Sequence, residues 1–251
     1  MIQTILYFAL FNLAIQMSCV WCTPVTEIVS ISARAGEVTV IDNGSNIPPG
    51  QKRNQGSLSN GWSWQNTGLL THGCSGSRIH ISDCYGMQLS SKTNENLEHD
   101  LPPDAISRQR IEIASGQKGV AGETHSFEWK YYLSPETGTA NGFFHLMQLL
   151  NENPDGKVQN GPVITLDARN NKVYIDDFYN QGCSGSSCPS ISLSSFVGRP
   201  HYTESRGKQL LKYEVHGIMG TGGPVKFGTY RAAVAGMTAS YAAVGDFKQL
   251  S

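Results

Sequence analysis

Residues 108–113 (Arg-Gln-Arg-Ile-Glu-Ile) combine ionisable side chains with the period-two alternation of a β-strand. On a strand, Arg108, Arg110 and Glu112 share one face while the two isoleucines share the other. Because a guanidinium holds a carboxylate through two parallel N–H donors, this face has the chemistry of a groove floor for acidic ligands. A solvated outer face with an Arg–Glu pair is the alternative, and for an isolated strand it is the simpler one.

Residues 224–231 (Pro-Val-Lys-Phe-Gly-Thr-Tyr-Arg) place Lys226, Gly228 and Tyr230 on one face of a second strand. A glycine in the middle of a strand weakens the sheet unless another group must approach the backbone closely. A sugar ring flanked by the ammonium and the phenol would be such a group. A bulge beside a surface tyrosine is the alternative.

Residues 143–150 (Phe-Phe-His-Leu-Met-Gln-Leu-Leu) carry His145 and Gln148 in an apolar run. The short length, the preceding Gly142 and the Asn-rich turn that follows favour a buried strand over a helix. Side chains three apart face opposite sides of a flat strand, so both reach one cleft only across a bulge or a twist. A lone histidine in such a strand is more often a satisfied core residue than a catalyst.

The rest of the chain alternates short strand-like segments with turns rich in Gly, Pro, Asn and Ser. About eleven strands predict one β-sandwich or jelly-roll domain over residues 23–251, with an irregular segment at 42–60. The predicted strands are 27–32, 38–41, 78–82, 108–114, 125–133, 143–150, 163–168, 172–177, 209–216, 225–231 and 237–247.

Residues 1–22 contain no charged side chain, and their apolar centre is too short for a transmembrane helix. They predict a secretory signal peptide cleaved after Cys22, although the usual basic residues after Met1 are missing. A buried N-terminal segment is the alternative. The mature protein is therefore expected to be secreted and extracellular.

Four cysteines remain after this cleavage, and they form two locally close pairs. Both loops begin with the same five residues, Gly-Cys-Ser-Gly-Ser, at 73–77 and 182–186. An oxidising compartment predicts the disulfides Cys74–Cys84 and Cys183–Cys188, because neither pair has the spacing of a zinc site. Asn43 begins the Asn-Gly-Ser glycosylation sequon, which fits an exposed loop.

The composition excludes some classes of function. Lys and Arg number 19 against 20 Asp and Glu, for a net charge of −1, and charged residues make up only 16%. This argues against a nucleic-acid binder that works through a basic field, and against a charge-extended disordered chain. We expect a monomer without nucleic-acid or membrane partners.

Residues 143–148, 161–166 (Gly-Pro-Val-Ile-Thr-Leu) and 226–231 together resemble secreted jelly-roll polysaccharide lyases, namely the fungal glucuronan lyases and the heparinase-like and alginate-lyase-like groups. Arg110-x-Glu112 is similar to the Arg-x-Glu strand of the alginate lyases, and residues 226–230 match their Lys-x-Gly-x-Tyr strand. Their Gln-x-His strand is replaced here by His145-x-x-Gln148. The resemblance spans roughly residues 107–231 and implies an all-β, concanavalin-A-like two-sheet jelly roll.

This resemblance implies β-elimination on a uronate polysaccharide such as glucuronan or alginate. The uronate carboxylate must be neutralised, which suits Arg110 and Gln148. Tyr230 would carry the proton, and a cationic neighbour such as Lys226 or Arg231 would lower its pKa. His145 is the alternative base.

The acidic polysaccharide is the implied partner, and the reaction requires no cofactor. The resemblance also allows a structural Ca²⁺ that would draw on Glu27 and Asp246. The candidate substrate-binding residues are Arg108, Arg110, Glu112, Lys226, Arg231 and Trp129.

Two other classes of function fit the same sandwich. A glycoside hydrolase needs two carboxyl groups across the scissile bond, which Glu112 and Glu128 would supply. A non-catalytic glycan-binding module would keep the groove without a competent Tyr–His pair. The fold alone does not separate these classes.

Overall fold

The computed structural model describes residues 37–116, 119–120, 124–152, 158–178, 182–202, 211, 213 and 222–250. The predicted signal peptide, the predicted strand at 27–32 and Glu27 lie outside these residues, as does 209–216 apart from 211 and 213. Within the described ranges, no helix is long and apolar enough to cross a membrane.

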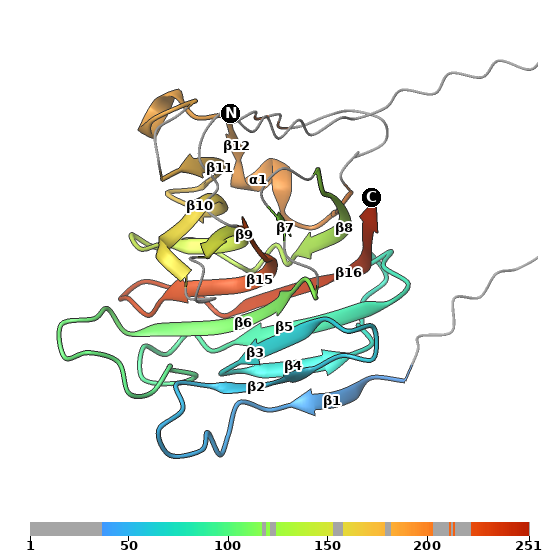
Figure 1. The fold of residues 1–251 in the computed structure, drawn as a ribbon, viewed down its shortest axis with the longest axis vertical. Helices are drawn as coiled ribbons and strands as arrows, with labels where there is room; N and C mark the ends of the chain where they lie inside the picture. Colours follow the sequence, from blue (N-terminus) through green and yellow to red (C-terminus); the bar gives the residue numbers. More distant parts are fainter. Residues whose placement is uncertain are drawn as a thin grey trace, which may run out of the picture.

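Two antiparallel sheets stack on each other, with their strands running in nearly the same direction (Figure 1). The first has the order β1 (Thr39–Asp42), β4 (Leu69–His72), β5 (Cys84–Leu89), β16 (Ser240–Leu250), β8 (Ser126–Leu133) and β13 (Pro200–Tyr202). The second has the order β12 (Ser190–Ser192), β11 (Lys172–Asp177), β10 (Val158–Arg169), β9 (Phe144–Glu152), β15 (Val225–Ala232), β6 (Arg108–Ala114), β3 (Ser63–Asn66) and β2 (Asn54–Ser57). Small elements are β7 (Gly119–Val120) paired with β14 (Gly222–Gly223), the 3₁₀ turn η1 (Gly185–Ser187) and the single turn α1 (Leu193–Phe196). The predicted all-β jelly-roll sandwich is confirmed.

Apolar side chains from both sheets meet between them and form the core. Ile111, Leu146 and Phe227 from the eight-stranded sheet meet Leu133 and Val244 from the six-stranded sheet, and all five are fully buried. Each such side chain stabilises the fold by roughly 1.5–3 kcal/mol. Because a slip of one residue would turn these side chains to the solvent, the core fixes the register of the strands and so the direction of every polar neighbour.

Most predicted strands are confirmed, including 143–150, which forms β9 rather than a helix. Two predictions are wrong. Residues 78–82 form no strand, because the backbone N–H groups of Ser82 and Asp83 bond the carboxylate of Asp246 instead of a neighbouring strand. Residues 42–60 are not irregular throughout, because the polar strand β2 pairs with β3 at the edge of the sheet.

Both predicted disulfides are present, with Cα–Cα distances of 5.7 Å for Cys74–Cys84 and 4.9 Å for Cys183–Cys188. Disulfides persist in oxidising compartments, so the two bridges are consistent with secretion. Asn43 lies in an exposed loop after β1, where its side-chain oxygen accepts hydrogen bonds from the backbone N–H (3.0 Å) and the hydroxyl (2.6 Å) of Ser45.

Candidate active site

The face of the eight-stranded sheet that points away from the core is polar across six consecutive strands. We call it the polar face and define it by direct register partners and their alternating neighbours. Its side chains are Gln65 (β3), Arg108, Arg110 and Glu112 (β6), Lys226 and Tyr230 (β15), His145 and Gln148 (β9), Thr165, Asp167 and Arg169 (β10), and Lys172, Tyr174 and Asp176 (β11).

A bulge in β9 brings His145 and Gln148 to this same face. Leu146 and Met147 both pack against the core, and the β9–β10 register shifts between Leu166 and Asp167. One extra residue therefore separates His145 from Gln148, and the side chains that flank it point the same way. The sequence predicted that His145 and Gln148 could reach one cleft only across a bulge or a twist, and the structure has the bulge.

Gly228 has a packing role that differs from the predicted one. It pairs with Glu112, and a Cβ atom at this position would lie 2.1 Å from the backbone oxygen of Ile111. The β15–β9 register also shifts between Phe227 and Tyr230, so the bulge of the alternative interpretation is confirmed. The surface tyrosine of that interpretation is wrong, because Tyr230 is buried. Gly228 is needed because the backbone of the neighbouring strand β6 approaches it closely, and not because a sugar ring does.

Tyr230 lies between two arginines. Arg108 Nη1 donates a 2.9 Å hydrogen bond to the phenol oxygen, and Arg110 Cζ lies 3.6 Å from the ring centre. Burial raises the pKa of Tyr230, and Arg110 and Arg108 offset only part of this effect. The expected lowering of this pKa by Lys226 or Arg231 is therefore wrong, because desolvation dominates and the cations at the ring are different ones. The phenol keeps its proton, and since its oxygen already accepts from Arg108, that proton can point at a ligand.

His145 lies directly beside this phenol. Tyr230 and His145 are register partners, and their ring centres are 5.5 Å apart. His145 Nδ1 donates to Asp167 Oδ1 at 2.5 Å, and the imidazole stacks on Phe143 at 4.9 Å. Because the buried Asp167 carboxylate holds the proton on Nδ1, the lone pair of Nε2 is left for an incoming acidic C–H or O–H group.

Glu112 anchors three donors around this pair. It accepts from Arg110 Nη1 at 2.5 Å and from Gln148 Nε2, and Lys226 Nζ lies 3.7 Å from it. Burial would raise the pKa of Glu112, but Lys226 and Arg110 hold it below the usual carboxyl range. Lys226 Nζ also donates to Gln65 Oε1 at 3.0 Å. Glu112 thus positions Arg110, Gln148 and Lys226 rather than meeting a ligand itself.

The Glu98 carboxylate offsets part of the positive charge of three arginines at this site. Its carboxylate lies 2.7 Å from Arg110, 2.9 Å from Arg53 and 3.5 Å from Arg108. This cluster holds four cationic side chains against two carboxylates, so two positive charges are uncompensated. Its members are Arg53, Arg108, Arg110, Lys226, Glu98 and Glu112. Such a patch attracts an anionic ligand to the tyrosine and the histidine.

Two predicted substrate-binding residues lie elsewhere. Arg231 points to the core side of β15, where Nε donates to Gln109 Oε1 at 2.9 Å and Nη1 to the Thr238 carbonyl at 2.8 Å. Burial there lowers the pKa of Arg231 to about 10. Trp129 belongs to the six-stranded sheet and packs against Phe227 at 4.5 Å. The structure brings neither residue to the polar face.

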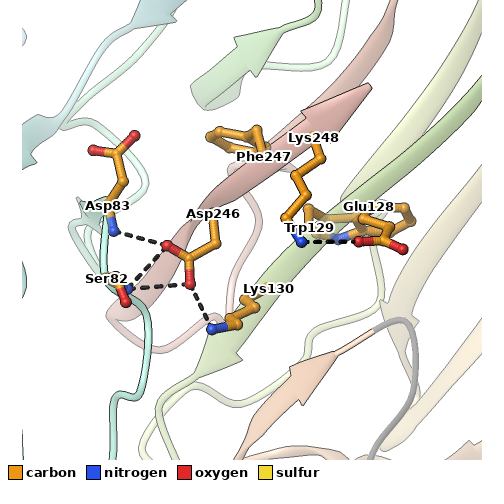
Figure 2. Close-up of a pocket in the computed structure, with 8 residues that line it drawn as sticks. All are labelled: Ser82, Asp83, Glu128, Trp129, Lys130, Asp246, Phe247 and Lys248. Atoms are coloured by element: carbon orange, nitrogen blue, oxygen red, sulfur yellow. Dashed lines mark hydrogen bonds and ion pairs between the residues drawn. The ribbon is translucent and has the colours of Figure 1, made fainter. Parts of the chain in front are cut away.

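Asp246 lines a hollow on the six-stranded sheet, together with Trp129 and Lys248 (Figure 2). Its carboxylate lies 2.5 Å from Lys130 Nζ and accepts from the backbone N–H groups of Ser82 and Asp83. A cation and N–H donors do not fit a Ca²⁺ ligand set, which is built from oxygens. Across the described ranges, no group of three or more His, Cys, Asp or Glu residues could hold a metal ion.

Sequence reasoning missed several residues that support the site. Asp167 had a usable signal, because it alternates with Thr165 in a predicted strand. Glu98 had none, since it lies in a polar loop that the Leu97–Gln109 bridge brings against β6. Phe178, whose exposed fraction is 44%, lies 6.4 Å from the His145 ring. It offers the exposed aromatic ring that Trp129 was expected to supply.

Solved structures with a similar fold include polysaccharide lyases. A family 7 alginate lyase, A1-II′, in complex with a substrate has a TM-score of 0.47 and 8% identity, over 71% of this chain and 83% of that chain. Alginate lyase AlgAT5 from polysaccharide lyase family 7 has a TM-score of 0.42 and 9% identity, over 70% and 83%. The xyloglucanase domain of NopAA, a type three effector from Sinorhizobium fredii, in complex with cellobiose has a TM-score of 0.32 and 12% identity, over 79% and 96%. No family sequence model and no curated protein sequence matches.

Proposed function

We propose that this protein is a secreted polysaccharide lyase that cleaves a uronate-containing polysaccharide by β-elimination. The observation that carries the proposal is the pair of Tyr230 and His145, which lie side by side on adjacent strands next to a net positive cluster. An acid, a base and a carboxylate-binding cation are the three groups that this reaction needs. Here all three lie on one face of one sheet.

The first step needs a neutralised carboxylate at the sugar that loses its C5 proton. Arg110 donates from Nε to Glu98 and from Nη1 to Glu112. A guanidinium has five N–H donors, so other donors of Arg110 are not used in these two bonds. Gln148 uses its amide nitrogen on Glu112, and this nitrogen carries a second hydrogen. The other donors of these two side chains would bind the uronate carboxylate as negative charge builds on it in the transition state.

The proton transfers then divide between the two rings. His145 Nε2 takes the C5 proton, and the C–H electron pair becomes the C4–C5 double bond while the C4–O4 bond breaks. Tyr230 gives its proton to the departing O4. The raised pKa of Tyr230 favours this acid role over a phenolate base. Asp167 keeps His145 in the required tautomer and stabilises the imidazolium that forms.

The two disulfides and the uncharged N-terminal segment support secretion, where such polymers would be met. The hydrolase alternative loses its proposed carboxyl pair. Glu112 lies on the polar face, whereas Glu128 lies on β8 of the other sheet and pairs with Lys248 at 3.3 Å. A hydrolase that uses other carboxyl groups and a glycan-binding module without catalysis are the two alternatives.

The experiment is an assay of the purified protein on alginate, on glucuronan and on a neutral glucan as control. A lyase produces ultraviolet absorbance from the new double bond on an acidic polymer and none on the neutral one. Reducing ends without that absorbance would indicate a hydrolase, and binding without products would indicate a glycan-binding module. Either result would contradict the proposal.

A further inference from the structure

In the eight-stranded sheet, β11 and β12 lie at the end opposite β2 (Figure 1). The polar face continues beyond the candidate active site to this end, where its side chains line another hollow. Its volume of about 330 Å³ falls within the roughly 300–1,000 Å³ typical of small-molecule sites. Side chains of the β10–β11 hairpin form its floor, and the loop closed by the Cys183–Cys188 disulfide forms a wall. Its lining residues include Arg169, Lys172, Tyr174, Asp176 and Ser186.

The strand register fixes the distance of this hollow from the catalytic pair. Tyr230 pairs with His145, His145 with Asp167, and Asp167 with Tyr174. These four residues form one row across four neighbouring strands, which lie about 4.8 Å apart. Tyr174 is therefore roughly 10 Å from His145 and roughly 14 Å from Tyr230 on the same face. One unit of a linear uronate chain spans roughly one strand spacing, so a bound polymer would reach the hollow about three units from the O4 that Tyr230 protonates, which is beyond the reach of a trimer.

The side chains in the hollow suit an acidic sugar. Arg169 Cζ lies 5.5 Å from the centre of the Tyr174 ring, and Lys172 is exposed beside Arg169 as its register partner. The Tyr174 hydroxyl is buried and makes no well-aligned hydrogen bond within the ranges that the structure describes, and Arg169 is a donor beside it. Asp176 is half-buried on the same face. The hollow thus offers two cations for a carboxylate, an aromatic ring, a hydroxyl that needs a partner, and one acceptor for a sugar hydroxyl.

We propose that this hollow is a distal binding site for a uronate unit of the same polysaccharide, which rests on the proposed function of the neighbouring site. Arg169 and Lys172 bind the carboxylate of that unit, and the Tyr174 hydroxyl and Asp176 bind its sugar hydroxyls. Ser186, on the disulfide loop, lies at the wall. This site makes the enzyme favour long chains over short ones, because only a long chain fills both sites at once.

The test is steady-state kinetics on a size series of oligouronates from the trimer upward, with the full-length mature protein. The variants are Arg169→Ala and Tyr174→Phe. Arg78→Ala is the matched control, because it removes the same charge from an exposed loop before β5. Loss of one charge-assisted contact predicts a KM about tenfold higher for the longest oligomers with Arg169→Ala. The kcat values and the KM for the trimer stay unchanged, and Arg78→Ala behaves as wild type.

Equal KM values for wild type and Arg169→Ala on every oligomer would overturn the distal site while the lyase activity stands. An equal rise in KM on all sizes, the trimer included, would also overturn it. Calorimetric titration of the longest oligomer into wild type and Arg169→Ala gives an independent readout. If wild type makes no unsaturated product, the proposed function fails, and weaker binding by Arg169→Ala would still support the site. Equal binding by the two proteins, or none by either, would contradict it.

Discussion

Tyr230 and His145 are register partners on adjacent strands, and their ring centres lie 5.5 Å apart although 85 positions separate them in the chain. Each ring is held by a charged neighbour on its far side, Tyr230 by Arg108 and His145 by Asp167. Arg108 therefore occupies the phenol oxygen and Asp167 occupies Nδ1, which leaves the phenol proton and Nε2 for a ligand. The proposed elimination uses these two groups as its acid and its base.

Tyr230→Phe tests the acid. This change removes one hydroxyl and keeps the ring that Arg110 covers, so folding and substrate binding should persist. Loss of general acid–base catalysis predicts a fall of about 10²–10⁴-fold in kcat on a polyuronate. The rate is measured together with a thermal melt of the same variant. A folded variant with near-native turnover would remove Tyr230 from the mechanism.

Asp167→Asn tests the positioning of the base. The amide no longer stabilises the imidazolium and also allows the wrong tautomer of His145, so kcat should fall by roughly 10²-fold while KM changes little. The pH profile of kcat should change as well, which a purely structural role would not produce. The control is Asp104→Asn, an exposed carboxylate in a loop. Equal effects of the two changes would contradict a special role for Asp167.

Glu112 predicts how stability depends on pH. Its folded-state pKa lies below the ordinary value of 4.5, so the unfolded chain binds the proton more tightly. The stability that Glu112 contributes is therefore fully present above about pH 4.5 and is lost as the pH falls below it. Glu112→Gln leaves Lys226 and Arg110 without this partner and should cost about 3–5 kcal/mol at neutral pH. Thermal melts across the acidic range should show a weaker pH dependence for the variant, and an unchanged dependence would count against this assignment.

Arg231→Lys tests whether Arg231 stabilises the fold or binds the substrate. Lysine cannot reproduce the fork of hydrogen bonds that Arg231 makes with Gln109, Thr238 and Ser90, so the melting temperature should fall. Because Arg231 faces the core side of β15, the KM for a polyuronate should stay at the wild-type value. A raised KM in a variant of unchanged stability would return Arg231 to the groove.

Strands and the direction of their side chains could be predicted from the sequence wherever apolar and polar residues alternate strongly. Residues 108–114 and 225–231 alternate clearly, so both their strands and the shared face of Arg110 and Glu112 could be predicted. The same rule could have excluded Arg231, because the residue after Tyr230 must point to the other side of a strand.

Other parts of the site carried no local signal. β2 and β3 are short polar strands at one end of the sheet, so no apolar period marks them. Glu98 reaches the site from a loop through long-range pairing. The bulge at Leu146 and Met147 also carries no local signal. Both residues are apolar and would fit a regular strand, and only the pairing with β10 shows that both point to the core. The net pKa of Tyr230 depends on how deeply the fold buries it, which spacing along the chain does not reveal.

Elimination by Tyr230 and His145 is tested most directly by mass spectrometry of the products formed from a polyuronate in water enriched in heavy oxygen. Elimination uses no water, so we expect fragments with an unsaturated end, lighter by one water than hydrolysis products and free of the heavy isotope at the cleavage site. Fragments that are saturated and carry one heavy oxygen at the new end would show hydrolysis and would exclude elimination by this pair.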